Sequence, residues 1–202
     1  MTAPRLVLAS ASPRRRELLG TLGLAFDVVP SAMEEPLPPG VAPAAQAMRL
    51  ALAKARDVAT RVSAGTVVLG ADTLVVLAGC PFGKPTSPDD ARRMLAALGG
   101  RAHEVVTGVA VVEAETGREL TASVVSRVVM RDYSADEVEA YVATPEPYDK
   151  AGAYAVQGEG ARLVARVEGC YTNVVGLPLT TTARLLRAVG LALQTGPRTE
   201  QP

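Results

Sequence analysis

Short apolar runs alternate along this chain with segments that carry helix-start signals. Leu6-Val7-Leu8-Ala9 is an apolar run of strand length, and Ser12-Pro13 behind it joins an N-cap residue to a proline suited to the first helical position. Two strand-like stretches, 103–113 and 121–130, are joined by a turn near 115–117 and predict an antiparallel hairpin. This mixture predicts an α/β protein in which helices flank a mixed β-sheet, rather than a purely parallel sheet.

The other elements are placed by periodicity and by capping residues. Gly70-Ala71-Asp72-Thr73 is expected to interrupt the apolar run that begins at Thr66 and resumes at Leu74. Ser134-Ala135-Asp136-Glu137 matches a capping box and opens a short helix that stops at Thr144-Pro145. The chain is also expected to form helices at 13–20, 43–61, 87–99 and from about 180, and strands at 26–29 and near 161–167.

The length of 202 residues suits one sizeable core, or two lobes around a cleft. We expect a single domain over residues 1–193, followed by a polar tail at 194–202. No apolar run reaches the length of a membrane span, and the N-terminus lacks the order of a signal peptide. The chain is therefore predicted to be cytoplasmic.

Charge and composition exclude several classes of function. The 21 basic and 21 acidic residues give a formal net charge of zero, which argues against a general binder of nucleic acid or of anionic membranes. One histidine and two cysteines leave little room for a histidine metal site, a Ser-His-Asp triad or a disulfide framework. We expect His103 to be structural, so any anion site must come from a local cluster.

The segment Arg14-Arg15-Arg16 is a candidate for such a cluster. Of two helices that begin with Ser-Pro, one continues with Asp89-Asp90, which the positive end of the helix dipole favours, whereas the other continues with three arginines. Free N–H groups and arginine forks at a helix start together suit a phosphate. The alternative is a solvated basic face that Glu17 pairs in part.

Carboxylates and lysines supply the other candidate groups. Asp72 follows a buried strand, where it could hold Mg²⁺ or accept a proton from water, although it could equally cap a turn. Glu34-Glu35 could bring a second carboxylate to a shared metal, or could face solvent. Lys54 could snorkel beside an apolar stripe, Lys84 lies in a tight loop, and Asp149-Lys150 precede a small-residue stretch. Gln157 could read a base edge or lie on the surface.

Taken together, the motifs resemble the Maf family of nucleotide pyrophosphatases, first linked to septum formation. The matching stretches run in order from residue 5 to residue 190 and are LASASPRRREL, Glu34-Glu35, LGADTLVVL, GKPTSPDDARRML, GRAHEVVTGVAVV, EPYDKAGAYAVQG and NVVGLPL. Residues 78–82, before the GKP motif, depart from the pattern and leave the shape of that loop open. The resemblance implies a Maf- and ITPase-like fold with a deep cleft between two lobes, a divalent cation (Mg²⁺ or Mn²⁺) and a homodimer.

Residue by residue, the resemblance makes Asp72 the catalytic base and a metal ligand together with Glu35. Lys54 and Lys84 would act beside it in the cleft. The substrate-binding residues would be Ser12, Arg14, Arg15, Thr73, Asp149, Lys150 and Gln157. Arg14, Thr73 and Gln157 match the branch that acts on dTTP and UTP, not the branch that acts on 7-methyl-GTP.

The implied reaction is hydrolysis of dTTP and UTP, or of modified pyrimidine triphosphates, to the monophosphate and pyrophosphate, with a link to cell-division arrest. Three alternatives stay open. The first is a non-catalytic, nucleotide-binding regulator of septum formation, and the second is a nucleic-acid binder that uses the arginine-headed helix. The third is a hydrolase of other triphosphates with a different base pocket.

Overall fold

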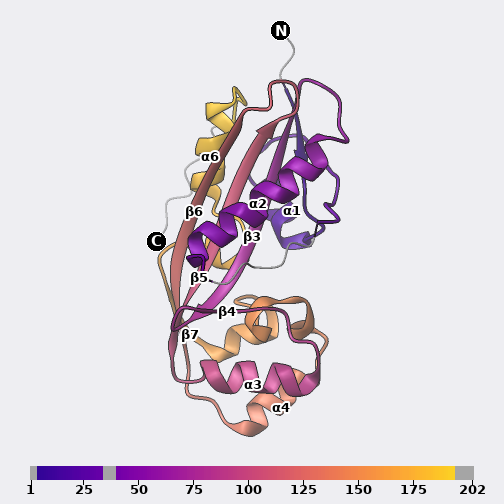
Figure 1. Cartoon of the computed structure of the whole chain (residues 1–202). Helices are drawn as coiled ribbons and strands as arrows, with labels where there is room; N and C mark the ends of the chain where they lie inside the picture. Colours follow the sequence, from indigo (N-terminus) through magenta and orange to yellow (C-terminus); the bar gives the residue numbers. More distant parts are fainter. Residues whose placement is uncertain (1–3, 34–39, 194–202) are drawn as a thin grey trace.

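The computed structural model describes residues 4–33 and 40–193, and its centre is a seven-stranded sheet (Figure 1). The strands pair in the order β2-β1-β3-β5-β6-β7, and β4 pairs with β3. β1 is parallel to β2 and β3, whereas β4, β5, β6 and β7 join by antiparallel pairing, so the predicted mixed sheet is confirmed. The strands are β1 (Arg5–Leu8), β2 (Phe26–Val28), β3 (Thr66–Leu77), β4 (Cys80–Phe82), β5 (Ala102–Glu113), β6 (Glu119–Met130) and β7 (Val164–Glu168).

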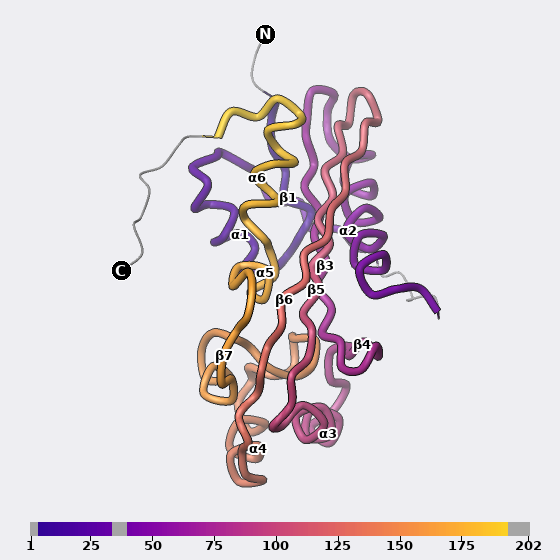
Figure 2. Tube along the Cα trace, turned by 90° about the vertical axis from the view of Figure 1, so that its left-hand side faces the viewer, coloured from indigo at the N-terminus to yellow at the C-terminus, as the bar shows by residue number. Residues whose placement is uncertain are grey.

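Helices cover both faces and one end of the sheet. In Figure 2, α2 lies along one face, while α1, α5 and α6 lie on the other. Below them in Figure 1, α3 and α4 pack at the far end with three 3-10 turns at 146–149, 151–153 and 158–163. The bounds are α1 (Pro13–Gly20), α2 (Pro43–Ala59), α3 (Pro88–Leu98), α4 (Ala135–Val142), α5 (Tyr171–Val175) and α6 (Leu179–Ala188). None of the described helices combines the length and the apolar character needed to cross a membrane.

The core follows the alternation of side chains along the strands. In β1, Leu6 and Leu8 join the apolar cluster under α1 and α6, while Val7 joins the cluster under α2. A further cluster at the far end gathers residues of α3, α4 and the 3-10 turns around Val105 and Val128. The strands β3, β5 and β6 run twelve residues each, and both β3 and β5 contribute to the clusters at either end. One domain over 1–193 stays a prediction, and the tail 194–202 lies outside the described residues.

Helix starts occur where the capping residues predicted them. The Ser12 hydroxyl accepts from the N–H of Arg15, and the Ser87 hydroxyl accepts from the N–H of Asp90 at 3.1 Å. At α4, Ser134 and Glu137 form a complete capping box. Each such cap satisfies an N–H group that the helix itself leaves unpaired, a contribution of about 1 kcal/mol.

The predicted break at Gly70-Ala71-Asp72-Thr73 is wrong, because β3 continues through it and pairs with β5 at all four residues. The small residues there serve packing rather than a turn. A Cβ on Gly70 would lie 2.2 Å from the carbonyl oxygen of Ala51 in α2, so only glycine lets the helix approach this closely. Asp72 therefore lies within a strand and not beyond its end.

The edge of β3 has a gap that the sequence did not predict. β1 pairs with β3 only as far as Leu69, and β4 pairs with it only from Val75 onward. Between them, residues Gly70–Leu74 have β5 on one side and no described strand on the other. Over this stretch β3 therefore has one unpaired edge, although it is a central strand of the sheet elsewhere. The sequence also failed to predict β4, α5 and the 3-10 turn at 158–163, and β7 begins at Val164 instead of 161.

His103 has the structural position expected of it. It is buried in β5, and its Nε2 lies 2.7 Å from the hydroxyl of Tyr154. Its Nδ1 has no hydrogen-bond partner in the described part of the chain. Burial lowers the pKa of His103 from 6.5 to about 4, because the charged ring would lose its hydration.

We expect Gly108→Ala to lower the free energy of unfolding by about 3 kcal/mol, because overpacking forces backbone to move. A Cβ there would lie 2.2 Å from the carbonyl group of Ala47 in α2. The matched control is Gly20→Ala, where a Cβ meets nothing within 4 Å. Urea unfolding of both variants measures the effect, and equal stability of the two would contradict the close helix–sheet contact.

Protonation of His103 should make stability pH-dependent. Its folded pKa lies below its unfolded value of 6.5, so the unfolded chain binds the extra proton first and stability falls as pH drops from 6.5 towards 4. His103→Gln removes this component, so the stability advantage of the wild type over the variant should shrink by about 2 kcal/mol between about pH 7.5 and about pH 5. Denaturant titrations at both pH values test this, and a constant difference would refute it.

Candidate active site

A cavity of about 730 Å³ opens at the gap in the edge of β3. Residues 9–15, which follow β1 and begin α1, form one wall, and Asp72–Val75 of β3 form its floor. Other walls come from 82–84 at the end of β4, from 149–157 among the 3-10 turns, and from 174–176 at the end of α5. Elements from both ends of the sheet thus meet at the stretch of β3 that has no described strand on one side.

The described lining of this cavity is strongly cationic, although the whole chain is neutral. Its seven charged members comprise five cations and two anions, which gives a formal charge of +3. They are Arg14, Arg15, Lys54, Lys84, Lys150, Asp72 and Asp149. A concave site with this excess charge attracts anions and holds them at short range.

Asp72 forms an ion pair with Lys54, which reaches it from α2. The carboxylate side chain is 14% exposed and the lysine side chain 25%, so both are partly shielded from water yet open to the cavity. Gly70 and Asp72 lie two residues apart on the face of β3 that α2 covers, and the close approach of the helix at Gly70 therefore brings Lys54 within reach. The snorkelling alternative for Lys54 is wrong.

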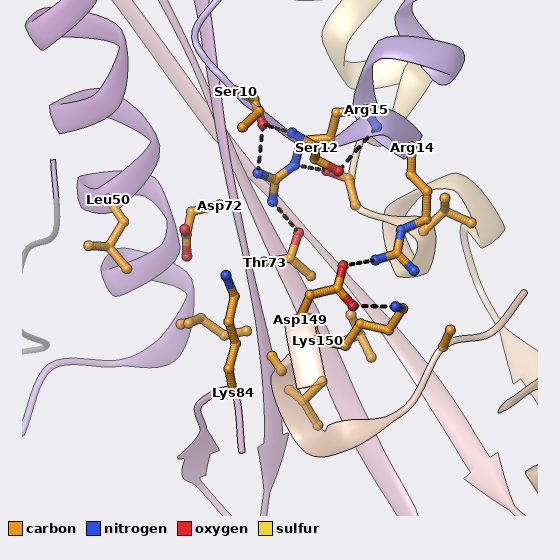
Figure 3. A pocket seen from close by; sticks show the side chains of 18 of the residues that line it. Ser10, Ser12, Arg14, Arg15, Leu50, Asp72, Thr73, Lys84, Asp149 and Lys150 are labelled. Atoms are coloured by element: carbon orange, nitrogen blue, oxygen red, sulfur yellow. Dashed lines mark hydrogen bonds and ion pairs between the residues drawn. The ribbon is translucent and has the colours of Figure 1, made fainter. Parts of the chain in front are cut away.

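Arg15 is held by neutral oxygen atoms, not by a carboxylate. Its Nη1 donates to the hydroxyl of Ser10 at 3.3 Å and its Nη2 to the hydroxyl of Thr73 at 3.1 Å (Figure 3). Its Nε donates to the carbonyl oxygen of Gly176 at 2.9 Å. Burial lowers the pKa of Arg15, while the nearby charge of Asp72 acts in the opposite direction. Three of the five guanidinium N–H groups are thereby used, and two have no partner in the described structure.

Asp149, on the wall opposite α1, binds two further cations, the neighbouring Lys150 and Arg14 from the start of α1. It forms an ion pair with Lys150 and lies 3.7 Å from the guanidinium of Arg14 (Figure 3). Burial opposes ionisation of this carboxyl group, but Lys150 and Arg14 outweigh that effect and hold the pKa of Asp149 below its usual value. Lys150 also donates to the carbonyl oxygen of Glu146 at 2.7 Å, which fixes the 3-10 turn that carries Asp149.

The cavity brings together every predicted site residue that the structure describes. Lys84 points toward Asp72 and forms no ion pair with any described residue (Figure 3). Ser12 lies at the start of α1, Thr73 follows Asp72, and the exposed Gln157 lies at the rim. Glu35, the predicted second metal ligand, lies outside the described residues.

The donor set fits a divalent cation that is shared with a ligand. Within 4–33 and 40–193 no group of three or more His, Cys, Asp and Glu side chains could hold a metal by itself. Asp72 nevertheless presents carboxylate oxygens to the cavity, and Mg²⁺ in proteins commonly takes one or two carboxylates and completes its shell with water and substrate phosphates. These residues therefore suit an ion that arrives with a polyphosphate.

Sequence reasoning missed several residues of the site. Ser10 and Tyr154 line the cavity, and Gly176 supplies the carbonyl oxygen that holds Arg15. Thr107 and Asn173 lie behind the wall and form hydrogen bonds that lead to Thr73. The NVVGLPL stretch contains both Asn173 and Gly176, but its apolar sequence gave no sign of a role.

Comparison with known proteins gives one consistent result. The family model described as "Maf-like protein" matches residues 5–189. A dTTP/UTP pyrophosphatase of Moorella thermoacetica is 56% identical over 187 residues, which cover 93% of this chain and 96% of the relative. A dTTP/UTP pyrophosphatase of Anaeromyxobacter dehalogenans is 53% identical over 95% of this chain and 97% of the relative.

Among solved structures, a nucleoside-triphosphatase (dITP/XTP pyrophosphatase) from Mycobacterium abscessus aligns with 93% of this chain and 100% of its own. Its TM-score is 0.47 and its sequence identity 16%. This likeness is too distant to support an argument about chemistry.

Proposed function

The chain belongs to the Maf family, and from that premise we propose that it hydrolyses dTTP and UTP to the nucleoside monophosphate and pyrophosphate. As an enzyme it is a nucleoside triphosphate pyrophosphatase, which attacks the bond between the α- and β-phosphates. The observation that carries the proposal is the cationic cavity whose floor presents the ion-paired carboxylate of Asp72. An action on modified pyrimidine triphosphates, a homodimer, a cytoplasmic location and a link to division arrest stay predictions.

The start of α1 would bind the triphosphate tail. Pro13 has no N–H and the N–H groups of Arg15 and Arg16 are bonded to Ser12, so the N–H of Arg14 is the one that this helix start can offer. The guanidinium groups of Arg14 and Arg15 border the cavity, and arginine forks match phosphate oxygens in pairs. The two N–H groups of Arg15 that have no described partner are available for this purpose. Bound phosphates would also relieve the repulsion that two adjacent arginines create at the positive end of a helix.

Asp72 would serve the attacking water. Phosphoryl substitution is catalysed mainly by positioning and by neutralising charge, so the first requirement is a carboxylate fixed within the cavity. Lys54 fixes the carboxylate of Asp72 by its ion pair, and Lys84 adds a second cation on that side. From this position Asp72 would orient a water molecule and accept its proton.

Asp72 and Glu35 would hold the divalent cation. When bound, Mg²⁺ or Mn²⁺ would supply charge neutralisation on the phosphate oxygens. Asp149 would act at a distance from this chemistry, because it turns Arg14 and Lys150 towards one side of the cavity.

The preference for pyrimidine nucleotides is the part of the proposal that rests on relatives. Both relatives described above are dTTP/UTP pyrophosphatases by name, and together they cover nearly the whole chain. Thr73 and Gln157 are the residues of this cavity that we assign to base recognition, since a hydroxyl and an amide can form directional hydrogen bonds with a base edge.

Purified protein with Mg²⁺ or Mn²⁺ should convert dTTP and UTP to the monophosphate and pyrophosphate, with little orthophosphate. A panel of canonical and modified triphosphates, scored separately for pyrophosphate and orthophosphate, measures both the bond cleaved and the base preference. Binding without turnover would favour a non-catalytic regulator. Equal turnover of purine and pyrimidine triphosphates would remove the assignment to dTTP and UTP.

Asp72→Asn should lower kcat for dTTP by about 10²–10⁴-fold, because the amide cannot accept a proton from water. Steady-state kinetics on folded protein measures the loss. The matched control is Asp90→Asn: the side chain of Asp90 is 17% exposed and ion-paired with Arg93, but it lies outside the cavity lining. The control should keep the wild-type kcat, and near-normal turnover by Asp72→Asn would remove Asp72 from the mechanism.

A further inference from the structure

Two threonine hydroxyls and one carbonyl group form a chain of hydrogen bonds behind the cavity wall. The hydroxyl of Thr73 lies 2.9 Å from the hydroxyl of Thr107, which lies 2.9 Å from the carbonyl oxygen of Asn173. At its cavity end the chain meets Nη2 of Arg15, 3.1 Å from the Thr73 hydroxyl. We refer to Thr73, Thr107 and the Asn173 carbonyl as the hydroxyl relay.

The direction of every hydrogen bond in the relay is fixed by its two ends. A carbonyl oxygen can only accept, so the hydroxyl of Thr107 donates its single proton to the carbonyl oxygen of Asn173. The hydroxyl of Thr107 must then accept from the hydroxyl of Thr73, which thereby donates its only proton. Arg15 can only donate, which agrees with the remaining lone pairs of Thr73. Thr73 is therefore an acceptor on its cavity side and has no proton to offer there.

Asn173 anchors the relay firmly. It is fully buried, and its side-chain amide donates to the carbonyl oxygen of Val105 at 2.9 Å and to the hydroxyl of Ser126 at 3.0 Å. Its carbonyl oxygen accepts from the N–H of Gly176 as well as from Thr107. Since Gly176 in turn accepts from Nε of Arg15, the guanidinium is tied to Asn173 along two separate routes.

We propose that Thr107 is a positioning residue for the triphosphate tail, which acts on the ligand through Thr73 and Arg15. Thr107 is fully buried and does not line the cavity, so it cannot touch a ligand itself. By holding the proton of Thr73, it keeps the Thr73 oxygen turned to Arg15 and the two remaining N–H groups of Arg15 aimed into the cavity. This inference rests on the proposed function in one respect only, the identity of the ligand as a triphosphate.

The relay also determines which hydroxyl groups of the cavity can donate a hydrogen bond to a ligand and which can only accept one. The Ser10 hydroxyl accepts from the N–H of Ser12 and from Arg15, and its own proton has no acceptor in the described part of the chain. Ser10 can therefore donate to a phosphate oxygen, whereas Thr73 can bind only a group that donates, such as a ribose hydroxyl or a base N–H. Phosphates are thus directed to Ser10 and Arg15, and away from Thr73.

The test is binding of inorganic triphosphate to the full chain by isothermal titration calorimetry. Thr107→Val keeps the shape of the side chain but removes the relay, and we expect it to weaken binding about fivefold, the value of one hydrogen bond. Thr107→Ser restores the hydroxyl and should bind within about twofold of the wild type. The kcat/KM for dTTP should fall by the same factor in Thr107→Val.

A double-mutant cycle separates positioning from general loosening of the fold. If Thr107 acts through Arg15, adding Thr107→Val to Arg15→Ala should change the affinity by less than about 1.5-fold, since the single effects would not add. The matched control is Thr182→Val, another fully buried threonine, whose hydroxyl has no partner among the described residues. It should leave triphosphate binding unchanged.

Wild-type affinity in folded Thr107→Val, or additive effects in the cycle, would overturn the proposal. If Thr107→Val does not fold, Thr107→Ala takes its place in both measurements with the same expectations. Failure of the two ideas can be told apart: a wild type that binds inorganic triphosphate without hydrolysing dTTP or UTP contradicts only the proposed function. Hydrolysis that Thr107→Val leaves intact contradicts only the relay.

Discussion

The gap in the edge of β3 is the constraint on which the site depends. β1 ends at Leu8, opposite Leu69 of β3, because its chain turns into α1, and β4 joins β3 only at Val75. A strand that lacks a neighbour exposes side chains of both faces around the same edge. Asp72 faces α2 and Thr73 faces α1, so a carboxylate and a hydroxyl on opposite sides of the sheet reach one cavity. A continuous sheet would have separated them.

Charge explains why this gap suits a polyphosphate. The cavity concentrates a formal charge of +3 in a neutral chain, and two of its cations, Arg15 and Lys84, have no carboxylate partner in the described structure. Neutral oxygen atoms orient Arg15 without cancelling its charge. Cations that are partly buried and incompletely paired raise the free energy of the empty protein, and an anionic ligand recovers that energy on binding.

Local signals predicted the elements, and long-range contacts decided where prediction failed. Ser12, Ser87 and Ser134 marked helix starts because an N-cap depends only on residues within one turn. The prediction of a break at 70–73 was wrong because the small residues there make room for α2, about twenty positions away in sequence, and do not form a local turn. Arg14 and Asp72 could be proposed from the sequence, since charged residues beside apolar strands are conspicuous, whereas the role of Lys150 follows only from the family resemblance. Thr107 and Asn173 could not be proposed, because they are uncharged polar residues and the hydrogen bond between them joins positions 66 residues apart.

The hydroxyl relay depends on the sheet, because the direction of a hydrogen bond between hydroxyl groups is fixed only where both groups are held in place. A hydroxyl on a loop could turn its proton towards either partner, and its polarity would then follow the ligand. Thr73 and Thr107 are opposite each other on paired strands, and Asn173 is pinned to β5 and β6 by its own amide. The sheet thus fixes not only the position of the cavity's oxygen atoms but also which of them can donate. Since a phosphate only accepts, that order distinguishes the two ends of a nucleotide before any base contact is made.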